Sequence, residues 1–151
     1  MDYTALVFTP YSVRMGIVSI ILSDIKKIVP YKMFYQGQVS LREKDVKIIY
    51  PKLIKKFYFP KIIQCLTGGE ARFVLVAAPK IHSKINRLKG KFFYVDGVLI
   101  IDGLRRQYQK NGLDFEFIFH STDSNAETDE IGRHLFKEKY QIMFQRGLKI
   151  Q

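Results

Sequence analysis

Residues 117–124, with the sequence FIFHSTDS, carry more information than any other stretch of this 151-residue chain. The pattern predicts a strand over 115–119 that ends at His120, followed by hydroxyl and carboxylate side chains. Ser124 and Glu127 form a capping-box pattern, which starts a helix directly after this run. Helix N-termini attract phosphate, and an imidazole whose tautomer is fixed by a neighbour can act as a nucleophile. His120 is therefore a candidate catalytic residue, the alternative being an ordinary histidine near the end of a strand.

Three segments upstream have the short, apolar and β-branched or aromatic composition of strands. They cover residues 4–9, 31–39 and 71–78. The last, ARFVLVAA, has the continuous apolar run of a buried core strand. Residues 91–102 are also β-like, with a turn expected at Asp96-Gly97.

Helical patterns alternate with these strands. Apolar residues recur at helical spacing over 13–28, which predicts a first helix. A capping-box pattern at 40–43 opens a second helix, which Pro51 interrupts. A third helix begins near Pro60 and ends at Gly68-Gly69. Further helices are expected before Gly90, over 104–108 and after Ser124. This order predicts one α+β domain over residues 1–151: a ferredoxin-like antiparallel sheet with helices packed over one face.

The composition describes a basic globular chain. There are 25 basic and 14 acidic residues, a formal charge of +11, which favours polyanionic partners. The single cysteine, Cys65, excludes an intramolecular disulfide and fits a reducing compartment, so a cytoplasmic location is expected. The most apolar stretch, residues 17–28, is too short and too charged to span a bilayer, and the start lacks the basic region of a signal peptide. No membrane association is expected.

The stretch FIFHSTDS resembles the active-site strand and loop of nucleoside diphosphate kinases, whose pattern is Asn-x-x-His-Gly-Ser-Asp-Ser. Residues 4–16, 50–68 and 104–108 are similar to three further segments of that family, in the same order. The resemblance covers most of residues 4–136. It implies the nucleoside diphosphate kinase fold, a homo-oligomer (dimer or larger), and transfer of the γ-phosphoryl group of a nucleoside triphosphate to a nucleoside diphosphate through a phosphohistidine. Mg²⁺ would bridge the phosphates.

The resemblance implies a catalytic role for three residues. His120 takes the place of the phosphorylated histidine, and Thr122 that of the hydroxyl that supports it. Glu130 matches the glutamate that holds the other ring nitrogen, provided that one residue is deleted after Ser124. Without that deletion, Asp129 or Glu127 competes for the role.

The remaining implied roles concern the nucleotide and its metal. Tyr50 matches a tyrosine beside the histidine, and Phe59 matches an aromatic residue that stacks on the base. Arg105 matches a phosphate-binding arginine, and Arg87 lies one position from the place of a second such arginine. Asp123 matches a residue near the metal, and Thr9 falls in the nucleotide site. Each has a simpler interpretation, as a core ring, a half-buried tyrosine or a solvated charge. His82 and His134 match no family role and are expected at the surface, whereas Cys65 is expected in the core.

Two departures weaken the resemblance. Thr9 stands where the family has a lysine that reaches the phosphate, and Phe117 stands where it has an asparagine that binds the ribose. Residues 91–102 also replace the family's Asn-Pro-rich loop. Cations elsewhere are candidates for the missing charge, namely Arg14, Lys84, Arg87 and Arg106.

These departures leave two alternatives to an active phosphotransferase. One is a catalytically weak or inactive relative that binds nucleotide or a protein partner. The other is a nucleic-acid-binding module that uses the lysines and aromatic residues of 52–61, for which a solubilising basic surface is the simpler explanation. Nucleotides are favoured over nucleic acid as partners, although the charge does not exclude the latter.

Overall fold

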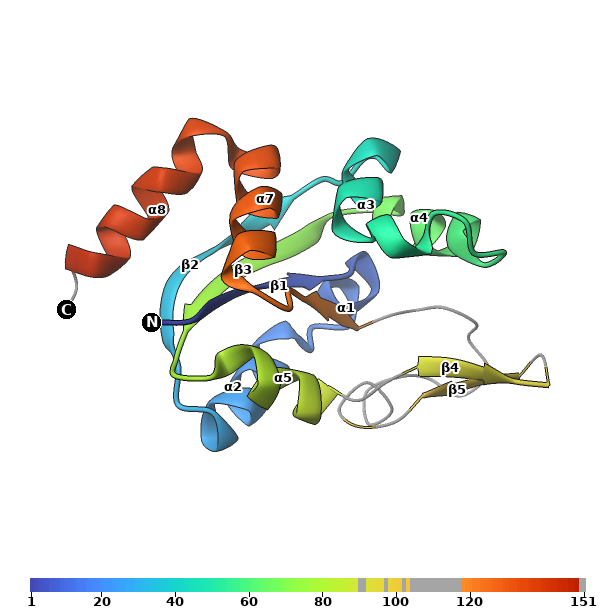
Figure 1. Cartoon of the computed structure of the whole chain (residues 1–151), viewed down its shortest axis with the longest axis horizontal. Coiled ribbons are helices and arrows are strands. Elements are labelled where there is room, and N and C mark those ends of the chain that lie inside the picture. Colours follow the sequence, from blue (N-terminus) through green and yellow to red (C-terminus); the bar gives the residue numbers. More distant parts are fainter. Residues whose placement is uncertain (90–91, 97, 102, 104–117, 150–151) are drawn as a thin grey trace.

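The computed structural model describes the chain apart from residues 90–91, 97, 102, 104–117 and 150–151 (Figure 1). Four strands form its main sheet: β1 (Tyr3–Phe8), β2 (Lys32–Val39), β3 (Ala71–Ala77) and β6 (Phe119–Ser121). Their order is β2-β3-β1-β6, and every neighbouring pair is antiparallel. The predicted α+β class and antiparallel sheet are therefore confirmed. Of the predicted last strand, Phe119 and His120 lie in β6, which continues to Ser121, and residues 115–117 lie outside the described part.

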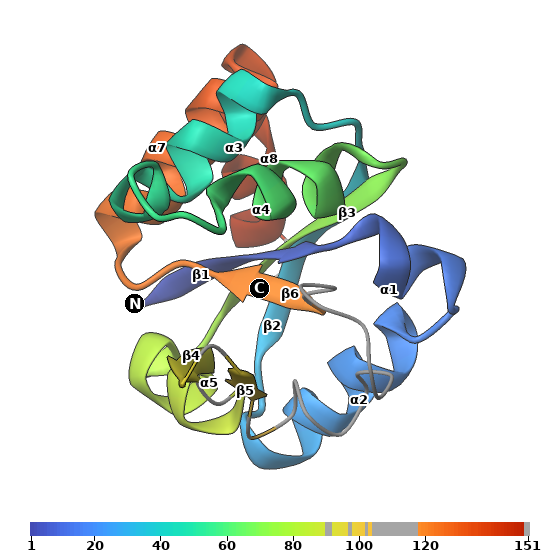
Figure 2. The same ribbon diagram turned by 90° about the vertical axis from the view of Figure 1, so that its right-hand side faces the viewer.

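Helices cover both faces of this sheet, not one face as predicted (Figure 2). One face carries α3 (Glu43–Ile49), α4 (Phe59–Thr67), α7 (Asn125–Phe136) and α8 (Glu138–Lys149). The other carries α2 (Val18–Ile28) and α5 (Ile81–Lys89). The reason lies in the central strands, whose residues point alternately into two separate cores. Phe73 and Leu75 of β3 belong to the core under α3 and α4, whereas Val74 and Val76 belong to the core under α2.

Shorter elements connect these layers. The helix α1 (Pro10–Arg14) follows β1, a 3-10 turn η1 (Pro51–Leu53) follows α3, and β4 (Phe92–Val95) pairs with β5 (Val98–Ile101) as a separate antiparallel hairpin. Asp96 of the expected turn follows β4 with a φ of 50°, and Gly97 lies outside the described residues. The expected helix over 104–108 falls outside the described residues.

Local details differ from the sequence predictions for identifiable reasons. The helical pattern over 13–28 divides at Gly16, whose φ of 67° ends the first segment, and Ile20 and Ile28 are 50% and 64% exposed. The second helix begins two residues later than the expected box, since the Asp45 carboxylate accepts a hydrogen bond of 2.7 Å from the N–H of Arg42. In the part of the chain that is described, no helix is long and apolar enough to cross a membrane.

Candidate active site around His120

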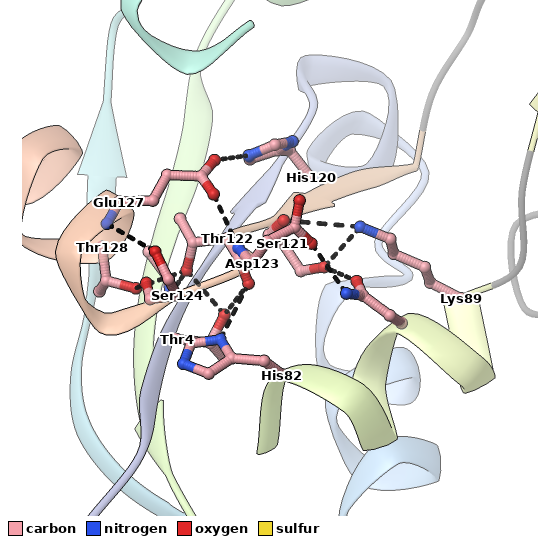
Figure 3. Close-up of polar contacts among 12 residues, drawn as sticks. Thr4, His82, Lys89, His120, Ser121, Thr122, Asp123, Ser124, Glu127 and Thr128 are labelled. Atoms are coloured by element: carbon pink, nitrogen blue, oxygen red, sulfur yellow. Dashed lines mark hydrogen bonds and ion pairs between the residues drawn. The ribbon is translucent and has the colours of Figure 1, made fainter. Parts of the chain in front are cut away.

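The strand β6 holds His120 at the edge of the sheet beside β1. His120 is opposite Val7 in the register, and its side chain is only 9% exposed. The imidazole meets the ring of Tyr50 nearly edge to face, with centroids 4.5 Å apart. On another side, Glu127 Oε1 lies 3.4 Å from His120 Nε2 (Figure 3). The histidine is thus fixed by an aromatic ring and a carboxylate from two different helical segments.

The first turn of α7 delivers Glu127 to the histidine. The hydroxyl of Ser124 caps the helix by accepting a hydrogen bond of 3.1 Å from the N–H of Glu127. The other Glu127 oxygen, Oε2, accepts a hydrogen bond of 2.8 Å from the N–H of Asp123. Burial alone would raise the pKa of Glu127, but His120, the Asp123 N–H and the charge of Lys89 together lower it below its usual value. Glu127 is therefore a carboxylate at neutral pH.

A buried network of threonine hydroxyls anchors the segment that follows His120. The hydroxyl of Thr122 lies 2.8 Å from that of Thr4 and 2.5 Å from that of Thr128, and it accepts a hydrogen bond of 3.0 Å from the N–H of Ala5. These contacts tie β1, the end of β6 and α7 together beneath the histidine. The Thr122 hydroxyl thus fixes the segment that follows the histidine through contacts in the core, without a direct hydrogen bond to His120 among the contacts described above.

The helix α5 lines the opposite side of the same segment. Lys89 donates a hydrogen bond of 2.7 Å from Nζ to the Ser121 hydroxyl, next to the histidine in sequence. Asn86 donates one of 2.8 Å to Asp123. The structure therefore places a lysine that we did not identify from the sequence against Ser121, the residue after His120. Its only sequence signal is a cation in the last turn of the predicted helix.

His82 is also part of this arrangement, although we expected it at the surface. Its Nδ1 lies 3.1 Å from the carbonyl oxygen of Thr122, and its Nε2 lies 3.0 Å from Oδ1 of Asn125. The same Asn125 oxygen accepts a hydrogen bond from the N–H of Tyr3. His82 therefore links α5 to the segment between His120 and α7.

Solved structures share this architecture. A nucleoside diphosphate kinase from Encephalitozoon cuniculi superposes with a TM-score of 0.70 over 93% of this chain and 92% of its own, at 13% identity. A nucleoside diphosphate kinase from Halobacterium salinarum, solved with CDP, superposes with a TM-score of 0.69 over 91% of this chain and 89% of its own, at 18% identity. One from Aquifex aeolicus superposes with a TM-score of 0.66 over 93% of this chain and 94% of its own, at 11% identity. The chain has the nucleoside diphosphate kinase fold. By sequence it matches no protein-family model and no curated protein.

Within this nucleoside diphosphate kinase fold, the carboxylate that reaches the histidine is Glu127 and not Glu130. Glu130 is exposed on α7. Asp129, the other alternative, accepts hydrogen bonds of 2.9 and 2.8 Å from the hydroxyls of Tyr3 and Tyr140. We expected Glu130 on the assumption that one residue is deleted relative to the family. In the structure, Ser124 caps α7 and turns the N-terminal end of the helix, which carries Glu127, towards the histidine.

The expected nucleotide contacts are only partly placed at this site. Tyr50 lies against the histidine, as expected. Phe59 is 4% exposed and packs in the core, so it offers no face to a base. Thr9 is also buried and caps α1 through its contacts with Ser12. Arg87 is exposed on α5, and Arg105 lies outside the described residues, as does Phe117.

The other expectations for polar residues are corrected in part. His134 is not an isolated surface residue, because its Nε2 lies 2.6 Å from Asp45 and joins α7 to α3. Cys65 is only partly buried, at the edge of the core. Of the remaining candidate cations, Arg14 donates a hydrogen bond of 3.5 Å to the carbonyl oxygen of Gly68, Lys84 is exposed on α5, and Arg106 lies outside the described residues.

Asp123 is the residue expected near a metal. It is exposed, three positions beyond His120, and among the described residues no group of three or more side chains is arranged to hold a metal ion. Mg²⁺ in phosphoryl-transfer sites is usually held by one or two carboxylates, water and substrate phosphates. A single exposed carboxylate therefore fits an ion that arrives with a nucleotide.

Proposed function

We propose that the protein is a phosphotransferase of the nucleoside diphosphate kinase type, with His120 as the phosphorylated residue. The observation that carries the proposal is the contact of 3.4 Å between Nε2 of a buried histidine and an ionised Glu127. A neutral imidazole donates from one nitrogen and has its lone pair on the other. If Nε2 donates to Glu127, Nδ1 is the nucleophile.

The proposed reaction has two half-reactions. The Nδ1 lone pair attacks the γ-phosphorus of a nucleoside triphosphate, a P–N bond forms, and the bond to the bridging oxygen breaks with release of the diphosphate. A terminal oxygen of a second diphosphate then attacks the same phosphorus and breaks the P–N bond. The imidazole is positively charged while it is phosphorylated, and Glu127 stabilises that charge.

Other residues position the reactants in this proposal. The Tyr50 ring and the carboxylate restrict rotation of the imidazole, which favours attack in one geometry. Lys89, beside Ser121, takes over part of the charge that a lysine at position 9 supplies in the family. Mg²⁺ bound to the nucleotide phosphates would neutralise their charge, with Asp123 as the residue to hold it.

The same proposal includes a homo-oligomer. The strand β2 lies at the edge of the sheet, and Met33 on it is 39% exposed. Ile20 and Ile28 of α2 are 50% and 64% exposed. Exposed apolar side chains next to an unpaired strand edge suit association with a second copy of the chain.

The direct test uses ATP labelled in its γ-phosphate, with Mg²⁺. We expect label on the protein that is stable in alkali and lost in acid, and that moves to added nucleoside diphosphates. The His120→Ala variant should take up no label. The His134→Gln variant should take up label normally, because His134 lies at the other end of α7 and contacts Asp45. Label that survives in His120→Ala would contradict the proposal.

A second candidate function is nucleotide binding without turnover. It is favoured by the burial of Thr9 and Phe59, which removes two contacts expected of an efficient enzyme. A ligand that binds only the native state raises the melting temperature. Stabilisation by ATP without any phosphohistidine would therefore favour this second function over the first.

A further inference from the structure

A cavity of about 560 Å³ lies between α7, α8 and the start of β1, and the proposed phosphoryl transfer does not use it. In Figure 1 the two helices diverge from the turn that joins them, and β1 begins below them. Small-molecule sites usually measure about 300–1,000 Å³ and combine apolar or aromatic walls with a few polar groups. The cavity has this size, and its lining contains both kinds of side chain.

Three aromatic rings form the apolar part of the lining. Phe144 meets the ring of Tyr3 nearly edge to face, with centroids 4.6 Å apart, and meets that of Tyr140 in the same way at 5.5 Å. Tyr140 is only 3% exposed, and its ring packs so closely on Gly132 that a side chain at position 132 would displace it. The rings are therefore held in place before any ligand arrives, which lowers the cost of binding.

A carboxylate of α7 lies at one end of these rings. The hydroxyls of Tyr3 and Tyr140 donate hydrogen bonds of 2.9 and 2.8 Å to Asp129. Burial, followed by the hydrogen bond and the charge of Asp129, raises the pKa of Tyr3 to about 12 and also raises that of Tyr140, whereas the charge of Arg133 acts in the opposite direction on both. Asp129 and Arg133 therefore act on the same two phenols.

The lining of the cavity contains two charges of each sign. Asp129 and Glu138 are the acids, and Arg133 and Lys137 are the bases. Within the described part of the chain, none of these four side chains takes part in an ion pair. Asp129 and Arg133 are four positions apart on α7, which places them about 6 Å apart along the helix axis. A molecule with an amino group and a carboxylate a few ångströms apart matches this spacing.

We propose that this cavity binds a free α-amino acid with an aromatic side chain. The ammonium group of the ligand binds to Asp129, its carboxylate binds to Arg133, and its ring packs against Phe144. A guanidinium binds a carboxylate through two parallel hydrogen bonds, and aromatic rings pack favourably edge to face or offset. A ligand with only one charge would leave either Asp129 or Arg133 covered and without a partner, which costs free energy.

The test is an NMR titration of the isotope-labelled full-length protein with matched probes. L-phenylalanine has both charges and the ring, whereas phenethylamine lacks the carboxylate, 3-phenylpropionate lacks the ammonium group and L-alanine lacks the ring. We expect L-phenylalanine to shift the resonances of α7 and α8. It should bind at least about 10-fold more tightly than each of the other probes, since a charged hydrogen bond or a buried ring contributes a factor of this size.

Two variants assign the binding to the cavity. Arg133→Gln should weaken the binding of L-phenylalanine about 10-fold, the lower end for a charged hydrogen bond because Arg133 is exposed, and should not weaken that of phenethylamine. The matched control is Lys139→Gln, which removes the same charge from an exposed position of α8 outside the lining. It should leave the affinity nearly unchanged. Circular dichroism and urea unfolding check that both variants are folded.

Three results would overturn the proposal. They are no shift with L-phenylalanine at about 10 mM, an equal affinity for phenethylamine or 3-phenylpropionate, and an unchanged affinity in Arg133→Gln. The outcome is separate from the proposed function, because Asp129 follows Glu127 by two positions and so points about 200° away from it around α7. His120→Ala should therefore abolish the phosphohistidine and still bind L-phenylalanine with normal affinity.

Discussion

Replacing Glu127 by glutamine tests the role of the carboxylate beside the histidine. The change keeps the side-chain shape and an oxygen that accepts from the Asp123 N–H, so the loop should keep its conformation. What it removes is a negative charge 3.4 Å from His120 Nε2. We expect slower phosphorylation, because the imidazole becomes positive as the P–N bond forms.

The size of this effect follows from the distance. Two unit charges at 3.4 Å attract by roughly 5 kcal/mol at an effective dielectric constant of about 20. The Glu127 side chain is 27% exposed and only part of the positive charge has developed in the transition state, so we take about half of this, roughly 2–2.5 kcal/mol. That corresponds to a rate about 30- to 70-fold lower.

The assay is rapid-quench measurement of phosphohistidine formation from labelled ATP in a single turnover. Glu130→Gln is the matched control, because it makes the same chemical change in an exposed residue three positions further along α7. Its rate should stay within about twofold of the unmodified protein, as for most surface changes. A large loss in Glu130→Gln with a normal rate in Glu127→Gln would refute the assignment.

Three further predictions concern other residues of the site and the core. Lys89→Met should lower kcat/KM for nucleoside triphosphates by about 10- to 150-fold in steady-state kinetics, because a charged hydrogen bond contributes about 1.5–3 kcal/mol. The control Arg87→Met, a change at an exposed residue of the same helix, should lower kcat/KM much less. Thr122→Val leaves the buried Ala5 N–H unpaired and should cost about 1–3 kcal/mol, seen as a melting temperature lower by roughly 3–10 °C, and an unchanged value would contradict the role of the network. Burial raises the pKa of Asp45, but the Arg42 N–H and His134 outweigh burial and hold that pKa below its usual value. The Asp45 carboxylate therefore stabilises the fold at a pH above the ordinary aspartate pKa, and this stabilisation is lost as the pH falls through the lowered pKa of the folded state. Asp45→Asn should therefore destabilise the protein at pH 7 in urea unfolding and should have a smaller effect in acid.

Much of the sheet was predictable because its two central strands are simple in composition. Residues 5–8 and 73–78 are continuous apolar runs, and β1 and β3 form there. The same continuity contained the information that both faces are covered, because a half-exposed strand alternates. Our prediction of helices over one face did not use it.

The carboxylate that lies beside His120 was harder to predict than the histidine itself. Positions 127, 129 and 130 all carry acids in the first turns of α7, and only their orientation separates them. The capping box contained a usable signal, since a glutamate three positions after the cap folds back over the helix start. Glu127 does this and reaches the Asp123 N–H and the histidine together.

The nucleotide contacts depend on packing that sequence patterns do not encode. Phe57 and Phe59 are the same residue type two positions apart, so the sequence pattern does not distinguish them. The helix α4 begins at Phe59 and turns the ring of Phe59 into the core, whereas Phe57 is exposed. Lys89 approaches Ser121 across 32 positions of the chain, a distance that no local pattern spans. Residues of this kind become candidates only when the strands have been placed.

The central claim is that His120 carries the phosphoryl group. It is tested most directly by mass spectrometry of peptides made at alkaline pH after incubation with ATP and Mg²⁺. We predict phosphate on the peptide that contains His120, its loss after brief acid treatment, and its disappearance when a nucleoside diphosphate is added. A phosphate located on His82, His134 or a hydroxyl residue, with His120 unmodified, would contradict the claim.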